Sequence, residues 1–254
     1  LMSNESLASA QHLSEDEQYA VKIDGLLYGA ADRSGGPVLL NDGTTADIPM
    51  ALSSATGNAW IDATINTSDL YANYAISAFN FFPSFIGSSQ NRITYLTGRY
   101  ACQVSALCTC ASLYGMCNMW ECADEYLEMW DRTGTTVLYT ENGIVFGSTQ
   151  ISSGASGFVS FCAAMGKSVS NRVNQDPTFA QYVLAVNAQQ PSLLSAWPSS
   201  GGHSTVVEGY VSASNNATGA ALEVTVIADG WNDSGRYINF HYPALLNPKG
   251  TFFF

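Results

Sequence analysis

Hydrophobic and polar positions divide the chain into a helical part followed by a strand-rich part. After Cys102 the apolar residues recur at helical spacing as far as Tyr114, and Gly115 is a suitable helix end, so the pattern predicts a helix over Cys102–Met116. Further helices are expected at about 119–130, 157–165 and 177–189, the last one opened by Asp176 and Pro177 as N-cap and first helical residue. Alternating patterns then predict closing strands over Ser192–Ala196, Ser204–Val211, Glu223–Ala228 and Arg236–His241. Helices followed by an antiparallel sheet indicate the α+β class.

Turn residues and changes in composition along the chain indicate three regions. Residues 1–18 are polar and are expected to form a mobile N-terminus. Residues 19–85 contain short strand-like pieces at Tyr19–Ile23 and Ala46–Met50 with turn residues between them, which is typical of a β-rich extension, a pro-region or a substrate-facing flap. Residues 86–254 are expected to form the main domain, with a hairpin around Asn142-Gly143 between the helices.

The amino-acid composition of the chain argues against some classes of binding partner. The chain has 254 residues, of which 46% are hydrophobic and 12% charged, with a net charge of −12 and a pI near 4.4. No basic cluster is available for phosphates, which argues against a nucleic acid or an anionic membrane surface as partner, and no apolar run is long enough for a membrane span. Few lysines and many small polar residues favour a secreted or cell-surface protein whose signal peptide has been removed, although Leu1–Tyr19 is not itself a signal peptide.

Three residues carry candidate chemistry. His203 follows a glycine pair and opens an apolar strand, where an imidazole is well held and still reaches solvent as a general base must. Cys102 opens the predicted helix, where main-chain amides and the helix dipole favour a thiolate nucleophile. Asp229 follows the strand of residues 223–228, where its carboxylate could hydrogen-bond the second imidazole nitrogen of His203 and fix its tautomer.

This arrangement resembles the papain-like cysteine peptidases, and most closely the bacterial branches typified by streptopain and the bacteriocin-processing, double-glycine peptidases. Cys102-Gln103-Val104-Ser105-Ala106 matches their Cys-Gly-Pro-(Thr/Ala)-Ala helix start loosely, and Gln190-Pro191 resembles the strand start before their histidine. The likeness covers roughly Tyr95 to Leu246 in the family's chain order of Cys, His and Asp. It implies a papain-like fold and hydrolysis of peptide or protein substrates by Cys102, His203 and Asp229, with no metal or organic cofactor.

The chain departs from that family at the oxyanion hole. Family members place a glutamine about half a dozen residues before the cysteine, whereas residues 93–99 contain none. Gln90 is the first candidate for this role, with Thr97 or main-chain amides as alternatives. Two other hypotheses stay open: a non-catalytic secreted binding module on the same fold, and an amidase or acyltransferase that uses the same triad.

The remaining candidates have simpler structural interpretations. Cys108, Cys110 and Cys117 are expected to be buried small side chains because Cys-x-Cys lacks zinc spacing, while a disulfide between Cys117 and Cys122 stays open. Glu208 is expected to be exposed on its strand. Four further phenylalanines are expected to form core and not a substrate groove: Phe79, Phe81, Phe82 and Phe85.

Overall fold

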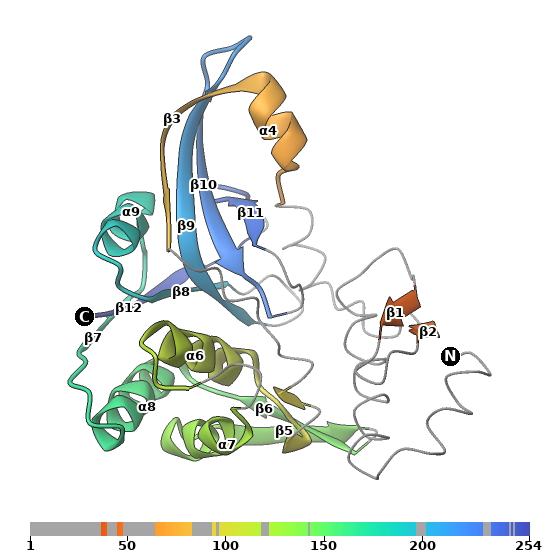
Figure 1. Ribbon diagram of the computed structural model, residues 1–254, viewed down its shortest axis with the longest axis vertical. Helices are drawn as coiled ribbons and strands as arrows, with labels where there is room; N and C mark the ends of the chain where they lie inside the picture. The colour runs from red at the N-terminus through yellow and green to blue at the C-terminus, as the bar shows by residue number, and fades with distance from the viewer. Residues whose placement is uncertain are drawn as a thin grey trace.

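The structure is a computed structural model, shown as a ribbon in Figure 1. It describes residues 37–39, 45–47, 64–82, 93–94, 97–117, 122–141, 143–196, 202–230, 235–243, 245 and 247–254. Strands β1 (Pro37–Leu39) and β2 (Thr45–Asp47) form a small antiparallel hairpin. The predicted strand Tyr19–Ile23 and the candidate Gln90 lie outside the described residues.

A seven-stranded antiparallel sheet forms the upper part of the molecule in Figure 1. Its order is β11-β10-β9-β8-β12-β7, and β3 also pairs with β9. The strands are β3 (Tyr74–Phe81), β7 (Asn171–Asn174), β8 (Ser192–Ala196), β9 (His203–Asn215), β10 (Ala221–Ala228), β11 (Arg236–Asn239) and β12 (Lys249–Phe253).

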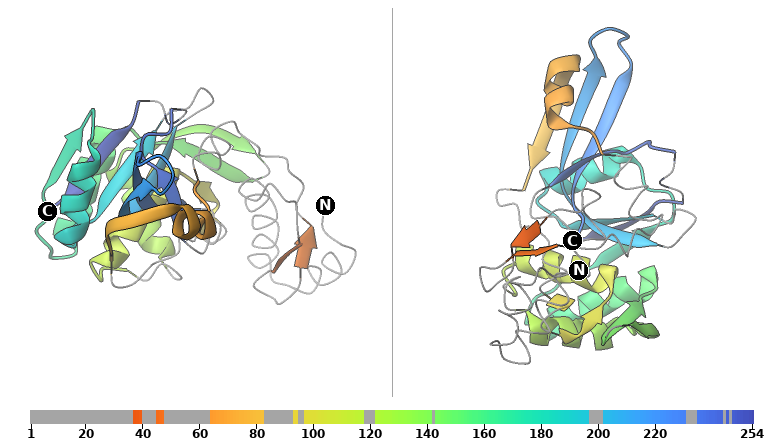
Figure 2. Two further views of the ribbon diagram at one scale, coloured as in Figure 1. Left: turned by 90° about the horizontal axis from the view of Figure 1, so that it is seen from above. Right: turned by 90° about the vertical axis from the view of Figure 1, so that its right-hand side faces the viewer.

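Strand β9 is the longest, and two strands share one of its edges. β8 pairs with its first five residues, from His203 to Val207, and β3 pairs with the stretch from Gly209 to Asn215. β10 pairs with the other edge, so β9 and β10 form a long hairpin that projects from the body with β3 and helix α4 (Thr67–Asn73) beside it (Figure 2). This arrangement leaves the start of β9 inside the body of the molecule.

Three helices lie together below the sheet in Figure 1: α6 (Cys102–Leu113), α7 (Ala123–Arg132) and α8 (Ile151–Ala164). A small sheet of order β4-β6-β5 accompanies them, made of β4 (Arg99–Tyr100), β5 (Thr136–Glu141) and β6 (Ile144–Ser148). Helix α9 (Phe179–Asn187) packs against β9 in the upper part.

Helix α6 is central to the lower core because almost every residue along it is buried. Val104, Leu107, Cys108 and Ala111 are fully buried and pack with side chains of α7 and α8. A Cβ atom built on Gly157 of α8 would lie 2.6 Å from the main-chain oxygen of Arg132, so α7 and α8 approach each other to backbone contact at this glycine.

The α+β class expected from the sequence is confirmed, and several element bounds differ. Asp176 and Pro177 do not start α9: its N-cap is Thr178, whose main-chain N–H donates to the Gln181 side chain in a capping box. β3 was not expected as a strand, and it hydrogen-bonds to β9 across the division proposed near residue 85.

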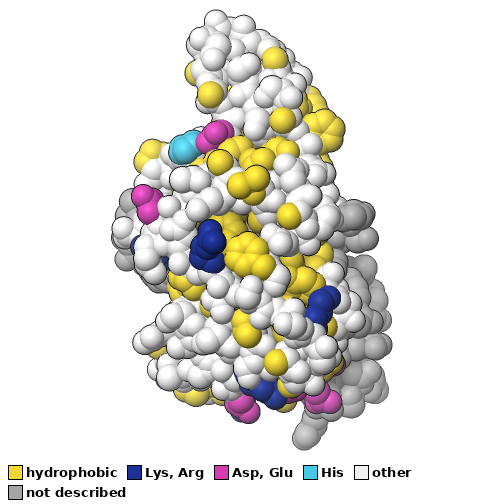
Figure 3. Space-filling view, turned by 90° about the vertical axis from the view of Figure 1, so that its left-hand side faces the viewer, with side chains coloured by type: hydrophobic (Ala, Val, Ile, Leu, Met, Phe, Trp, Pro, Cys, Tyr) yellow, Lys and Arg dark blue, Asp and Glu magenta, His cyan; other side chains and the backbone are white. Residues whose placement is uncertain are grey.

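The expected phenylalanine core is wrong for Phe79, which is 63% exposed, whereas Phe82 is buried. Phe85 lies outside the described residues. Charged side chains are sparse and scattered on the face shown in Figure 3, in keeping with a charged content of 12%. Within the described ranges no helix has the length and apolar character needed to cross a membrane.

Candidate active site

Cys102 is positioned by its two neighbouring elements. Strand β4 ends at Tyr100 and pairs in parallel with β6, so the chain is fixed just before the helix begins. The N–H of Ala101, the N-cap residue of α6, donates to the Tyr126 hydroxyl of α7 at 2.9 Å. Cys102 is then the first helical residue and is partly exposed, as expected from the sequence.

Packing of α6 on β9 brings Cys102 to the start of that strand. The main chain of Ser204 hydrogen-bonds to the Cys102 thiol. Ala106 and Val206 belong to the same buried cluster. Four residues of a strand and eight residues of a helix each span about 12–13 Å. A helix that lies along a strand therefore stays level with it, with four helix residues for every two strand residues.

The far end of this contact contains a residue that the sequence did not place correctly. Glu208 is only 2% exposed, and its charge acts on the thiol of Cys110, one helical repeat beyond Ala106. The expectation of an exposed Glu208 is therefore wrong. The reason is that both faces of β9 are covered by protein. Alternate residues along the strand therefore do not divide into an exposed set and a buried set.

The Cys102 thiol is not activated in the way expected from its place in the helix. Hydrogen bonds from main-chain groups of Ser204, Gln103 and Cys102 itself favour the thiolate. Although the residue as a whole is partly exposed, loss of water around the sulfur outweighs these bonds and raises the pKa of the thiol above 9.0. Cys102 is therefore a neutral thiol near pH 7, and a base is needed to remove its proton.

His203 is the first residue of β9 and is only 2% exposed, so the expectation that its ring reaches solvent is wrong. Its Nε2 lies 2.7 Å from the main-chain oxygen of Asp229. A carbonyl oxygen only accepts, so Nε2 carries the proton and Nδ1 holds the lone pair of the neutral ring. Burial lowers the pKa of His203 from 6.5 to about 4, while the bond to Asp229 opposes that change. The imidazole is therefore neutral near pH 7, with Nδ1 as the basic atom.

Asp229 directly follows the last residue of β10, as expected. The atom that contacts Nε2 of His203 is its main-chain oxygen, whereas the sequence predicted its carboxylate in this place. Its carboxylate is 1% exposed and forms an ion pair with Arg236, with Oδ2 and Nε 2.7 Å apart. Sequence reasoning missed Arg236. The feature that could have indicated its role is a basic residue at the start of a short strand, in a chain with only nine Lys and Arg residues.

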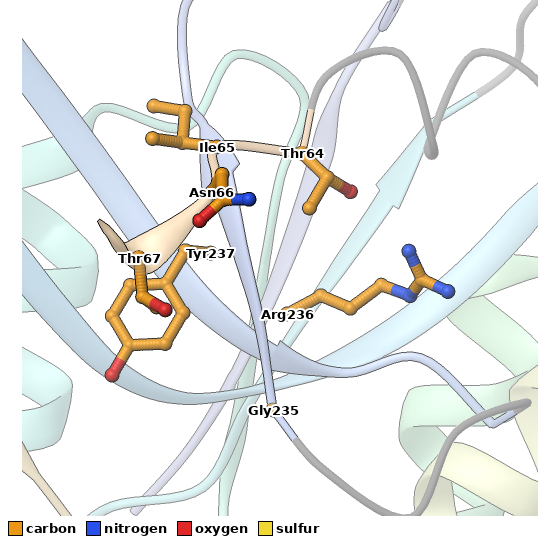
Figure 4. Close-up of a pocket in the computed structure, with 7 residues that line it drawn as sticks. All are labelled: Thr64, Ile65, Asn66, Thr67, Gly235, Arg236 and Tyr237. Carbon is orange, nitrogen blue, oxygen red and sulfur yellow. The ribbon is translucent and has the colours of Figure 1, made fainter. Parts of the chain in front are cut away.

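Arg236 also borders a cavity of about 290 Å³ between β11 and the segment before α4. Figure 4 shows Arg236 and Tyr237 extending in opposite directions from β11, with Thr64 above Arg236. The Arg236 side chain is 21% exposed. It therefore reaches from the buried carboxylate of Asp229 to this open cavity. A second, larger cavity of about 550 Å³ lies between the start of α9 and residues 240–248.

The other sequence candidates are placed as follows. Gln90, proposed for the oxyanion hole, lies outside the described residues. Gln103 is buried against α8, where its amide donates to the Ile151 carbonyl at 3.5 Å. Thr97 donates from its hydroxyl to the Ile93 carbonyl at 2.7 Å.

The six cysteines all lie within the described residues and are thiols, not disulfides, so the suggested Cys117–Cys122 disulfide is not formed. Cys108, Cys110, Cys122 and Cys162 are buried, as expected for Cys108 and Cys110, while Cys117 is partly exposed and contacts the Cys108 carbonyl. In the part of the chain that the structure describes, no three His, Cys, Asp or Glu side chains are grouped so as to hold a metal ion.

Comparison with known proteins adds no family. No protein-family model matches the chain, and no curated protein matches it in sequence.

Proposed function

We propose that this protein is a papain-like thiol hydrolase that cleaves peptide bonds in peptide or protein substrates, with Cys102 as nucleophile and His203 as general base. The observation that carries the proposal is the meeting of two chain segments a hundred residues apart. The thiol at the start of α6 contacts the main chain of Ser204, next to an imidazole at the start of β9 whose tautomer leaves Nδ1 basic.

The chemistry follows from the neutral state of both groups. As the Cys102 sulfur attacks the substrate carbonyl, its proton moves to Nδ1 of His203. His203 then gives this proton to the leaving amine, the C–N bond breaks, and a thioester to Cys102 remains. Water hydrolyses the thioester with His203 again as base, which releases the acid and restores the thiol. Asp229 holds the imidazole throughout.

The oxyanion formed during attack has one donor that the helix itself supplies. The main-chain N–H of Cys102 opens α6, and first-turn amides have no partner within the helix. Gln90 stays our proposal for the side-chain donor. Few charged residues and an excess of small polar ones support a secreted or cell-surface location, and the net charge of −12 supports a partner other than nucleic acid.

A non-catalytic binding module is the second candidate, and one observation favours it. Burial keeps Cys102 protonated and His203 uncharged, so the resting site lacks the thiolate–imidazolium pair that makes a thiol highly reactive. An amidase or acyltransferase would use the same steps with another leaving group or acceptor.

The test compares the two partly exposed thiols. The native protein is incubated with a mixed peptide library, and new termini are identified by mass spectrometry. We expect cleavage by the native protein and by Cys117→Ala, and a loss of at least about 10³-fold in Cys102→Ala, because removal of a triad nucleophile leaves little of the catalysis.

Trapping with a peptidyl epoxide supplies a second measurement. Peptide mapping is expected to find the adduct on Cys102 in the folded protein and not on Cys117. Absence of cleavage and of the adduct would reject the hydrolase in favour of the binding module. Transfer to added amines without release of acid would instead identify the acyltransferase.

A further inference from the structure

The larger cavity, of about 550 Å³, is built from segments that lie far apart in the sequence: the start of α9, Glu223 of β10 and residues 240–248. The N–H of Phe240 donates to the Glu223 carbonyl at 2.9 Å, which ties the beginning of the last segment to β10. Just beyond its end, the Lys249 ammonium donates to the Gln175 carbonyl at 2.8 Å, next to the start of α9. The cavity therefore has a fixed frame, and its volume lies in the range of about 300–1,000 Å³ that is usual for small-molecule sites.

Most of the lining of this cavity is aromatic or aliphatic. The rings of Phe179 and Phe240 lie side by side, with their centroids 5.8 Å apart, and Tyr242 also lines the cavity. Aromatic rings contact apolar groups, and their faces also attract cations. Such a lining is suited to a ligand that has an apolar or aromatic body. The remaining apolar lining comes from prolines, a leucine and an alanine: Pro177, Pro243, Pro248, Leu245 and Ala180.

The charge of the lining is negative. The described residues that form it include Asp176 and Glu223 but no Lys or Arg. Oε2 of Glu223 lies 2.6 Å from Nε2 of His241, which is the one lining residue that can carry a positive charge. His241 can neutralise at most one of the two carboxylates, so the lining has a net negative charge whether or not this imidazole is protonated. An anionic ligand is disfavoured in such a cavity, and a cationic one is favoured.

We propose that this cavity binds a small organic cation, namely a protonated amine carried on an apolar or aromatic body. The body contacts the rings of Phe179, Phe240 and Tyr242. The ammonium group can only donate hydrogen bonds, and the carboxylates of Glu223 and Asp176 are its acceptors at the cavity.

The proposed cation site is separate from the candidate active site. Glu223 lies near the start of β10, and Asp229, which contacts His203, follows the end of that strand. The six residue steps between them span about 20 Å in extended chain. The cation site therefore goes beyond the proposed hydrolase and does not depend on it: peptide cleavage and amine binding are measured separately, and either can fail without the other.

The test uses 2-phenylethylamine as the probe at pH 7 and low salt. It is compared with 2-phenylethanol, which has the same body without the charge, and with 3-phenylpropionate, which has the opposite charge. We expect the native protein to bind the amine at least about tenfold more tightly than the alcohol, because hydrogen bonds to charged groups are stronger than neutral ones, and not to bind the anion measurably. Equal affinity for the amine and the alcohol would overturn the proposal.

Histidine ring signals in nuclear magnetic resonance spectra show where the amine binds. His241 lines the cavity, whereas His203 is buried at the start of β9. Titration with 2-phenylethylamine is expected to shift the ring C–H signals of His241, assigned from His241→Gln, and to leave those of His203, assigned from His203→Gln, in place. Binding that leaves the His241 signals unchanged would locate the amine elsewhere and would overturn the proposal.

A pair of double variants tests the two carboxylates. Asp176→Asn/Glu223→Gln is expected to lose at least about tenfold in affinity for the amine, with little change for the alcohol. Asp124→Asn/Glu125→Gln changes the net charge by the same amount on α7, outside the cavity, and is expected to bind the amine as the native protein does. Unchanged amine binding in the first variant, or an equal loss in both, would count against a specific site in this cavity and would overturn the proposal.

Discussion

His203 should make the stability of this protein depend on pH in a way that one substitution removes. The imidazole has a pKa of about 4 in the folded protein because burial penalises its charged form, against 6.5 in the unfolded chain. Between these values the unfolded chain binds a proton at this position and the folded protein does not. The free energy of unfolding must therefore fall as the pH falls from 6.5 towards 4.

The magnitude follows from the difference between the two pKa values. One pKa unit corresponds to about 1.4 kcal/mol, so the contribution of His203 to this loss is about 3 kcal/mol by pH 4. Above pH 6.5 the ring is neutral in both states, and the contribution is constant. A loss of this size is a large part of the stability of an average domain.

Urea unfolding between pH 4 and pH 8 measures this contribution by comparison with His203→Gln. At high pH the variant is expected to be less stable than the native protein, because it loses packing and the bond to Asp229. Between pH 8 and pH 4 the difference in free energy of unfolding should change by about 3 kcal/mol in favour of the variant, since the variant has no imidazole to protonate at this position.

Val207→Ala is the control for lost packing, because it truncates a fully buried side chain that does not titrate. Its free energy of unfolding is expected to differ from that of the native protein by the same amount from pH 8 to pH 4. A constant difference between the native protein and His203→Gln from pH 8 to pH 4 would refute the reasoning, because it would mean that His203 is protonated as readily in the fold as in the unfolded chain.

Two further predictions concern the nucleophile and the helix packing. The rate at which iodoacetamide alkylates Cys102 should keep rising with pH beyond 9, because burial raises the pKa of the thiol; a plateau already reached below pH 7 would indicate a thiolate–imidazolium pair instead. Gly157→Ala should lower the free energy of unfolding by about 1–3 kcal/mol in urea titrations, because its Cβ meets the main chain of α7. Gly154→Ala, whose Cβ meets the side chains of Gln103 and Thr149 and no main-chain atom of another element, should cost less, and an equal cost would contradict the account of this contact.

Local patterns in the sequence were sufficient for several elements. The Ser192–Ala196 strand was predicted with its observed bounds, and the helix beginning at Cys102 was predicted with its observed start. Both depend on short-range features, a bounded apolar run and a helical repeat, that act within a few residues. The candidates Cys102, His203 and Asp229 were found in the same way, because each stands where such an element begins or ends.

Tertiary structure alone decided how those residues are used. β3 is a strand because the far half of β9 offers it an open edge, which no local pattern in Tyr74–Phe81 records. Cys102 is a neutral thiol because burial outweighs the amides at the helix start. The carboxylate of Asp229 is bound by Arg236 because antiparallel pairing brings β11 beside β10. The sequence by itself determined which residues could carry the chemistry; burial and long-range strand pairing, which depend on the whole fold, determined their protonation and their partners.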